Sequence, residues 1–443
     1  MKNKIPRLFK ALSLLFLAIC LISSLASCFD REEAEDLSPL YTRAELEQRI
    51  ETAEPLDARH VYTYLKYWRF PTFNDAKIYA IENAFKRHYV TELPAAEELA
   101  KATAECFFEY FIEDIDLQNE SEVTDALANC LTYCVGDNYA IYRTPSEYDD
   151  YDTDMSGELI GIGVEVVFNK LENTCLIENL IVGGGAADAG ILPGDYIVAV
   201  DGRLVSEMGY NKTLSSIKGE VGTDVEITVN RGGRELSFVI ERRHIVIKSV
   251  SYSIEEGNIG YIKITDFKDN TPSQFKEAVT ALEEAGCVGV IYDVRDNPGG
   301  YLSSVFEILS YIAPKNTQIV SFSNDYGAPM KSNDPHTFLV PSVVICNSRT
   351  ASASELFTAS LCDFGEMGLL KVAIVGEKTF GKGIMQNTYS FSDSSTITMT
   401  VAYFYSPLGK NYHGVGITPN YECENMENAL TDAFSELNKL LNK

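Results

Sequence analysis

The stretch VGVIYDVRDNPGG, residues 288–300, decides the fold of the longest part of this chain. Its first seven residues form an almost continuous apolar run, which is typical of a parallel strand buried on both faces of a sheet. The Pro298-Gly299-Gly300 turn that follows exposes backbone N–H groups at the start of the next predicted helix, where they can hold an anion or an oxyanion. The stretch therefore predicts a parallel sheet whose site lies beyond the ends of its strands.

Strands and helices alternate on both sides of this stretch. A strand is expected at 259–264, and a helix opens at Thr271 with proline at its first position and closes at Gly286. Further strands are expected at 343–346 and 372–375, with a helix starting near 352 between them. Alternation of this kind predicts an α/β core.

The preceding region has short strands and glycine turns. The runs GIGV at 161–164 and AGILPGDYIVAVDG at 189–202 make it resemble a PDZ domain. PDZ domains bind an extended chain end by adding it as a strand to a sheet edge. The resemblance implies that Gly161, Ile162 and Gly163 bind a substrate tail, whereas the alternative is a spacer without binding function.

Composition limits the classes of function. The chain has 443 residues with 37 Lys and Arg against 64 Asp and Glu, a formal charge of −27. Binding to the phosphate backbone of nucleic acids needs a basic face, so we expect no nucleic-acid partner. The length gives a soft prior of about three domains.

The first residues read as an export signal. Basic residues precede an apolar run from Ala11 to Leu25, which is too short to span a bilayer comfortably. The run ends in Leu25-Ala26-Ser27-Cys28, which resembles a bacterial lipoprotein signal, and this implies lipid attachment at Cys28 and an outward-facing position at the cell membrane. The alternative is an ordinary cleaved signal with a chance cysteine.

These patterns predict an α+β multidomain chain. Its expected parts are a signal at 1–27, a tether at 28–40, an N-terminal helical region at 41–154, a PDZ domain at 155–243, an α/β core at 244–422 and a C-terminal helix at 423–443.

The cysteines show no disulfide framework. Ten are present, two of them in the signal and at the anchor. Cys130 and Cys134 are four residues apart and would share a helix face, but a metal there would need two more ligands and no histidine is adjacent. We therefore expect buried thiols, no metal and no cofactor.

Two segments after predicted strands carry reactive side chains. Ser352, in TASASE at 350–355, opens a helix whose first N–H groups could stabilise an oxyanion, although an ordinary serine cap reads the same way. Lys382 lies between two glycines in TFGKG at 379–383. A lysine acts as a general base only when neutral, so its pKa must fall from about 10.4 to near 7, which burial can produce. The spacing of a phosphate-binding loop is absent.

Together with DVRDNPGG at 293–300 and YFYSPLGKNYHGVGITPN at 403–420, these motifs resemble the C-terminal processing peptidases, serine proteases with a Ser–Lys pair. The likeness covers roughly 125–425, and it implies that the core at 244–422 is an α/β serine protease core. It implies Ser352 as nucleophile, Lys382 as general base and Gln386 as the residue that orients the lysine. The implied oxyanion donors are the backbone N–H groups of Ala353, Gly299 and Gly300.

Some positions depart from the family's pattern. Thr350 replaces a serine, Asn420 stands where aspartate is common, and the spacing between the serine and the lysine is about five residues longer than usual. Asp363 matches an acidic position sometimes assigned to a charge relay, which Ser–Lys chemistry does not require.

The resemblance implies cleavage of proteins or peptides with free C-termini, with the PDZ domain recruiting the tail. A Ser–His–Asp protease using His413 is a rival mechanism, and a catalytically silent tail-binding adaptor is a rival function. The N-terminal helical region is a possible contact between copies of the chain.

Overall fold

The computed structural model describes residues 73–442, apart from 96–98, 100–101, 104–105, 108–109, 112–114, 117, 170–172 and 324–325. The predicted signal, the tether, the predicted lipid-attachment residue Cys28 and the first part of the helical region lie outside the described residues. Within these ranges, no helix is long and apolar enough to cross a membrane. The chain divides into two compact units.

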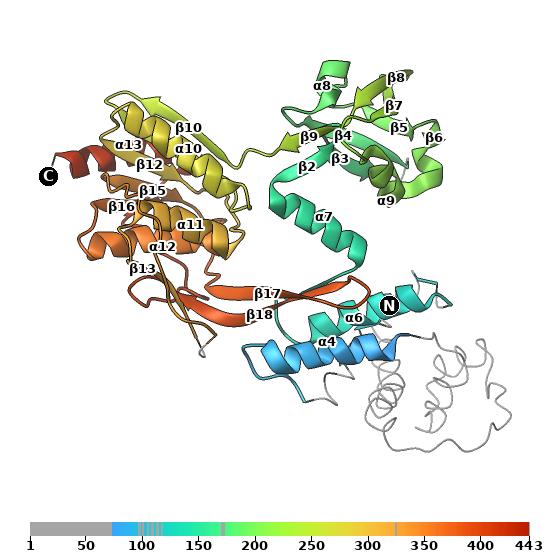
Figure 1. The fold of residues 1–443 in the computed structure, drawn as a ribbon, viewed down its shortest axis with the longest axis horizontal. Helices are drawn as coiled ribbons and strands as arrows, with labels where there is room; N and C mark the ends of the chain where they lie inside the picture. Colours follow the sequence, from blue (N-terminus) through green and yellow to red (C-terminus); the bar gives the residue numbers. More distant parts are fainter. Residues whose placement is uncertain are drawn as a thin grey trace. The chain divides into compact units, whose positions relative to one another are not determined.

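The first unit joins segments that lie far apart in the sequence. It contains the helices α4 (Asp75–His88) and α6 (Glu120–Cys134), the strand β1 (Ile141–Arg143), and the hairpin of β17 (Ile384–Ser390) with β18 (Thr396–Tyr405) as far as Tyr403. Figure 1 shows the orange-red hairpin beside the blue α4 and the teal α6. The sequence assigned 384–403 to the core, but Ile397, Met399 and Val401 pack here against Ile81 and Phe85 of α4.

The second unit contains a six-stranded sheet at the centre of the core. The strand order is β10-β11-β12-β15-β16-β19, and every pair except β10 with β11 is parallel. The strands are β10 (Val250–Glu255), β11 (Ile259–Ile264), β12 (Gly289–Asp293), β15 (Ser342–Cys346), β16 (Val372–Gly376) and β19 (Tyr421–Glu422). All residues of β12 and β15 are buried, as their continuous apolar runs predict.

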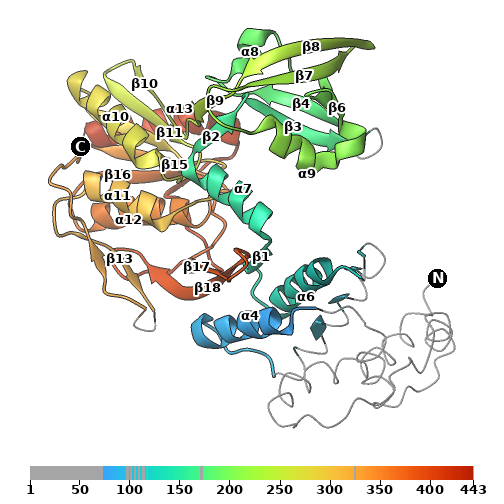
Figure 2. The same ribbon diagram turned by 45° about the vertical axis from the view of Figure 1, so that its right-hand side comes forward.

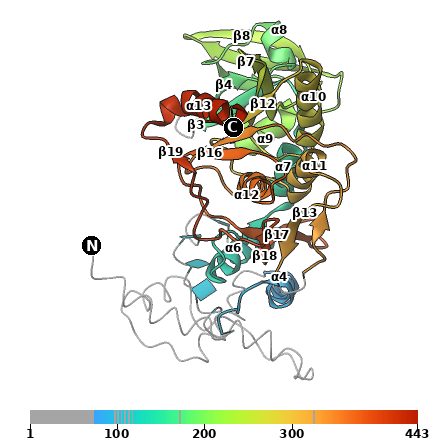
Figure 3. The same ribbon diagram turned by 90° about the vertical axis from the view of Figure 1, so that its left-hand side faces the viewer.

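Helices cover both faces of this sheet. On one face lie α10 (Thr271–Glu284), α11 (Leu302–Ile312) and α12 (Ala353–Glu366), and on the other lies α13 (Ala429–Leu441), as Figure 3 shows for α10, α11 and α13. Ala429, Ala433 and Leu437 of α13 pack on Val343 and Ile345 of β15. Strands β13 (Gln318–Phe322) and β14 (Met330–Lys331) extend the core, and Phe322 of β13 pairs with Phe404 of β18.

The same unit carries a second, antiparallel sheet with the order β3-β4-β5-β7-β8, and β6 pairs with β5. The elements are β3 (Val164–Asn169), β4 (Thr174–Leu180), α8 (Gly185–Ala189), β5 (Tyr196–Val200), β6 (Arg203–Leu204), α9 (Val205–Ile217), β7 (Asp224–Arg231) and β8 (Arg234–Glu241). Figure 2 shows this sheet with α8 and α9. Its core is aliphatic, including Ile177, Ile197 and Ile227. Because β3 lies at the edge of the sheet, an added strand could pair with it.

Two short strands and two helices adjoin these sheets. Strands β2 (Glu158–Gly161) and β9 (Arg243–Val246) form a separate antiparallel pair, one before and one after the small sheet domain in the sequence. Helix α7 (Pro145–Ser156) precedes them and enters the second unit at Asp150, and η1 (Met426–Asn428) precedes α13. Lys268 of the core donates to Asp154 of α7 at 2.6 Å, so a contact within this unit ties α7 to the core.

Candidate functional site

Ser352 lies immediately before α12, at the point where the chain leaves β15 and turns into the helix. Its backbone has φ +57° and ψ −117°, a left-handed conformation that is uncommon for a residue with a side chain. Such strain persists only where the surrounding structure holds it, and it is found mostly at functional sites. The residue is half-buried, whereas the small residues on both sides of it, Ala351 and Ala353, are buried.

A buried carboxylate connects the serine segment with the lysine segment. Glu355 is fully buried, and its Oε2 accepts the backbone N–H of Ser352 at 2.9 Å and that of Lys382 at 2.7 Å. Its Oε1 accepts the hydroxyl of Thr379 at 2.6 Å and the N–H of Gly381 at 2.7 Å. Four donors therefore compensate the burial of this charge, and they fix the two segments to one side chain.

The role of Glu355 was missed from the sequence, where glutamate in TASASE reads as an ordinary residue of the first helical turn. The available signal was the capping-box position, three residues after a serine that precedes a helix. The box explains the hydrogen bond to Ser352, but only the fold brings residues 379–382 to the same carboxylate.

Asn297 joins the glycine turn to the serine segment, as Glu355 joins the lysine segment to it. It is fully buried, its Oδ1 accepts the N–H of Gly299 at 2.9 Å, and its Nδ2 donates to the carbonyl of Ile264 at 3.0 Å. The carbonyl of Asn297 accepts the N–H of Ala351 and the hydroxyl of Ser354, both at 3.0 Å. The turn after β12 is thus bound directly to the segment that carries Ser352.

The predicted oxyanion donors differ in whether their N–H group is already donated to another residue. Gly299 has φ +111°, and a Cβ there would lie 2.8 Å from the Cβ of Ser352, so the turn touches the serine and only glycine fits. Its N–H is already donated to Asn297. Ala353 is the first residue of α12, where N–H groups lack a carbonyl within the helix. The oxyanion role stays a prediction for the N–H groups of Ala353 and Gly300.

Lys382 is half-buried between Gly381 and Gly383. A Cβ at Gly383 would lie 2.8 Å from the backbone nitrogen of His413, so the chain passes too closely for any side chain there. Gln386, the predicted orienting residue, lies on β17 and belongs to the first unit, whereas Ser352 and Lys382 belong to the second. Its Nε2 donates to the backbone carbonyl of Tyr139 at 2.6 Å.

Asp363 holds a loop at the other end of α12. It is buried, and its carboxylate accepts the N–H of Leu408 at 2.9 Å, the ammonium of Lys410 at 2.9 Å and the hydroxyl of Ser406. These partners give it a structural role. Tyr412, which follows this loop, donates its hydroxyl to the carbonyl of Ser352 at 3.4 Å, and burial raises the pKa of this phenol well above its ordinary value.

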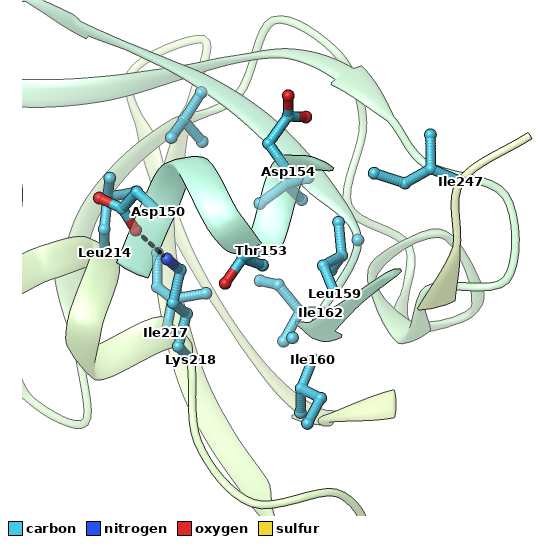
Figure 4. Close-up of a pocket in the computed structure, with 14 residues that line it drawn as sticks. Asp150, Thr153, Asp154, Leu159, Ile160, Ile162, Leu214, Ile217, Lys218 and Ile247 are labelled. Carbon is cyan, nitrogen blue, oxygen red and sulfur yellow. Dashed lines mark hydrogen bonds and ion pairs between the residues drawn. The ribbon is translucent and has the colours of Figure 1, made fainter. Parts of the chain in front are cut away.

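The small sheet domain contains a pocket beside the edge strand β3 (Figure 4). The predicted tail-binding residues Gly161, Ile162 and Gly163 line it, together with Leu214 and Ile217 of α9. Gly163 has φ +79°, and a Cβ there would lie 2.6 Å from the Cα of Gly184, so this loop requires glycine. The pocket has the apolar walls and the strand edge that an extended apolar chain end would need.

Helix α7 also lines this pocket. Asp150, Thr153 and Asp154 line it, and Asp150 forms an ion pair with Lys218 (Figure 4).

Within the described ranges, no group of three or more His, Cys, Asp or Glu side chains is arranged to hold a metal ion.

Comparisons with known proteins agree with this architecture. The sequence model of Peptidase family S41 matches residues 258–423, and that of the PDZ domain matches residues 176–231. A probable CtpA-like serine protease of Staphylococcus haemolyticus is 32% identical over 307 residues, which are 68% of this chain and 60% of the relative. The carboxy-terminal processing protease CtpA of Bacillus subtilis is 31% identical over 309 residues, 69% of this chain and 65% of the relative.

This chain therefore spans less than two thirds of the length of these two relatives. Among solved structures, the photosystem II D1 C-terminal processing protease is 22% identical, with a TM-score of 0.46 over 82% of this chain and 97% of that chain.

Proposed function

Because this chain belongs to the C-terminal processing peptidase family, we propose that it is a serine endopeptidase that cleaves protein substrates near their C-termini. One observation carries the proposal. The carboxylate of Glu355 accepts the backbone N–H groups of Ser352 and Lys382 on a single oxygen. A shared anchor of this kind holds a nucleophile and a base segment in a fixed relation, which is what covalent catalysis requires.

In the proposed reaction, the neutral amine of Lys382 takes the proton of the Ser352 hydroxyl, and the serine oxygen attacks the carbonyl carbon of the scissile peptide bond. The N–H groups of Ala353 and Gly300 stabilise the tetrahedral oxyanion. Lys382 then protonates the leaving amine, and water hydrolyses the acyl-enzyme.

The pocket beside β3 supports recruitment of the substrate tail. An extended tail pairs with β3, its terminal carboxylate lies at the Gly161–Gly163 loop, and its last apolar side chain enters the space between Ile162, Leu214 and Ile217. Gly161 and Gly163 leave room for the close approach of the tail's backbone.

The predicted N-terminal signal supports a position of this activity at the membrane. We propose that Cys28 carries a lipid and that the enzyme faces outward from a bacterial cell membrane. The helical region before the small sheet domain is the proposed contact between copies of the chain. Both statements rest on the sequence.

The function is tested by incubating this chain with a substrate protein whose C-terminus is apolar. The intact chain is expected to yield shortened products, and the Ser352→Ala chain is expected to bind the same tail without cleaving it. Mass spectrometry of the products and fluorescence anisotropy of a labelled tail give the two readouts.

A tail-binding adaptor without catalysis is the alternative. Binding by both chains with no product from either would contradict the peptidase and support the adaptor. Equal product formation by both chains would contradict the role of Ser352.

A further inference from the structure

The first unit contains a thiol cluster that the proposed peptidase does not use. Cys130 and Cys134 lie one turn apart on the same face of α6, and Cys106 comes from helical backbone that precedes α6 in the chain. The thiol of Cys106 is hydrogen-bonded with both of them. No disulfide joins these residues in the structure, and all three are thiols.

Cys106 and Cys130 differ in how deeply they are buried. Cys130 is only 1% exposed and packs with Phe107, Val123 and Leu127, whereas Cys106 is half-buried at the border of the same cluster. Cys106 and Cys130 both line a pocket in this unit, and Tyr110 and Tyr133 of its wall are 62% and 76% exposed. A small molecule in this pocket can therefore reach Cys106 before it reaches Cys130.

The hydrogen bonds also distinguish the two sulfurs electrostatically. The thiols of Cys130 and Cys134 stabilise the Cys106 thiolate and so lower the pKa of Cys106, despite its partial burial. The same contact with Cys106, together with desolvation, raises the pKa of Cys130. The thiolate is the nucleophile in disulfide exchange, and Cys106 is the more exposed of the two residues, so Cys106 attacks first and Cys130 second.

We propose that Cys106 and Cys130 form a reversible redox site that is oxidised to a disulfide by small-molecule disulfides. The Cys106 thiolate attacks one sulfur of the oxidant, whose S–S bond breaks, and a mixed disulfide and one released thiolate result. The Cys130 sulfur then attacks Cys106 and displaces the second thiolate. The two protein thiols are oxidised, the oxidant is reduced to two thiols, and the two protons of the protein thiols pass to these products.

Glutathione buffers of increasing oxidised fraction, applied to the full chain in detergent, test this site. Free thiols are alkylated, and proteolytic peptides are examined by mass spectrometry. We expect a Cys106–Cys130 peptide that dithiothreitol removes, and oxidation of Cys106 at least about tenfold faster than that of Cys287, which is also half-buried. Oxidation of Cys106 no faster than that of Cys287, or no linked peptide at full oxidation, would overturn the proposal.

Two variants separate the roles of the cysteines. The double variant Cys130→Ser/Cys134→Ser is expected to retain glutathione on Cys106 as a stable mixed disulfide, because both thiols that contact Cys106 are gone. Cys134→Ser is the matched control on the same helix face, and it is expected to keep the Cys106–Cys130 link. Absence of glutathione on Cys106 in the first variant, or loss of the link in the second, would contradict the assignment. The measurements on the unchanged chain decide the matter if a variant fails to fold.

Discussion

Helix α12 carries two buried carboxylates, and its two ends hold different parts of the core together. Glu355 in the first turn binds Ser352 and the segment that carries Lys382. Asp363, two turns later, binds residues of a loop that contains no predicted catalytic residue. Both side chains are almost inaccessible, at 0% and 1% exposure. Both ends therefore carry a buried carboxylate, and only the partners distinguish the residue that organises the site from the one that stabilises the fold.

The largest loss of activity is expected at the end of α12 next to Ser352. Glu355→Gln replaces one accepting oxygen by an NH₂ group, which must face N–H donors. The segments of Ser352 and Lys382 then separate, and we expect kcat to fall about 100-fold, the cost of a small misplacement of reacting groups. Steady-state cleavage of a tailed protein measures the loss, with circular dichroism to confirm folding.

Glu366→Gln is the matched control, because Glu366 lies on the same helix but is half exposed. It is expected to leave kcat within twofold. If Glu355→Gln behaves like this control, the proposed difference between the two ends of α12 is incorrect.

A second prediction concerns the glycine turn at the serine end. Gly299 has φ +111°, and Gly299→Ala places a Cβ 2.8 Å from the Cβ of Ser352, whereas Gly286 also has a positive φ, +67°, but a Cβ there meets nothing within 4 Å. Both variants are expected to lose about 1–3 kcal/mol of stability from backbone strain. Only Gly299→Ala is expected to lower kcat, by more than about tenfold. Equal activities of the two folded variants would show that the turn does not act on Ser352.

At the other end of α12, the effect is expected on stability. Leu408 and Ser406 donate to one carboxylate oxygen of Asp363, and Lys410 pairs with the other. Asp363→Asn can keep the first oxygen, but it removes the charge and turns a buried NH₂ group toward the ammonium of Lys410. We expect the free energy of unfolding to fall by about 2–4 kcal/mol in urea titrations, with kcat per folded molecule changed less than about threefold. A large loss of kcat at unchanged stability would instead give Asp363 a catalytic role.

The smallest loss of stability is expected for Lys410, the exposed partner of Asp363. The Lys410 side chain is 51% exposed, so water screens its ion pairs with Asp363 and Glu366. Lys410→Met should reduce stability by less than about 1 kcal/mol. Lys439→Met, which removes an exposed pair with Glu436 on α13, gives the reference value. A loss several times larger than the reference would mean that Asp363 depends on this lysine.

Much of this architecture could be predicted from the sequence. Continuous apolar runs predicted the parallel strands β12 and β15, and short motifs predicted the family and the PDZ domain, which the comparisons confirm. Local periodicity could not predict that 384–403 would leave the core and pack with α4 and α6, because this pairing depends on residues about 300 positions away. The roles of Glu355 and Asn297 were also hidden, since each joins a near partner to one that is distant in the sequence, Lys382 for Glu355 and Ile264 for Asn297.

The hydrolysis rate of the Lys382→Ala chain, measured beside those of His413→Ala and Ser352→Ala, tests the central claim most directly. If a neutral amine takes the proton of Ser352, Lys382→Ala falls to the background of Ser352→Ala, whereas His413→Ala retains substantial hydrolysis. Retained hydrolysis in Lys382→Ala together with its loss in His413→Ala would contradict the Ser–Lys assignment.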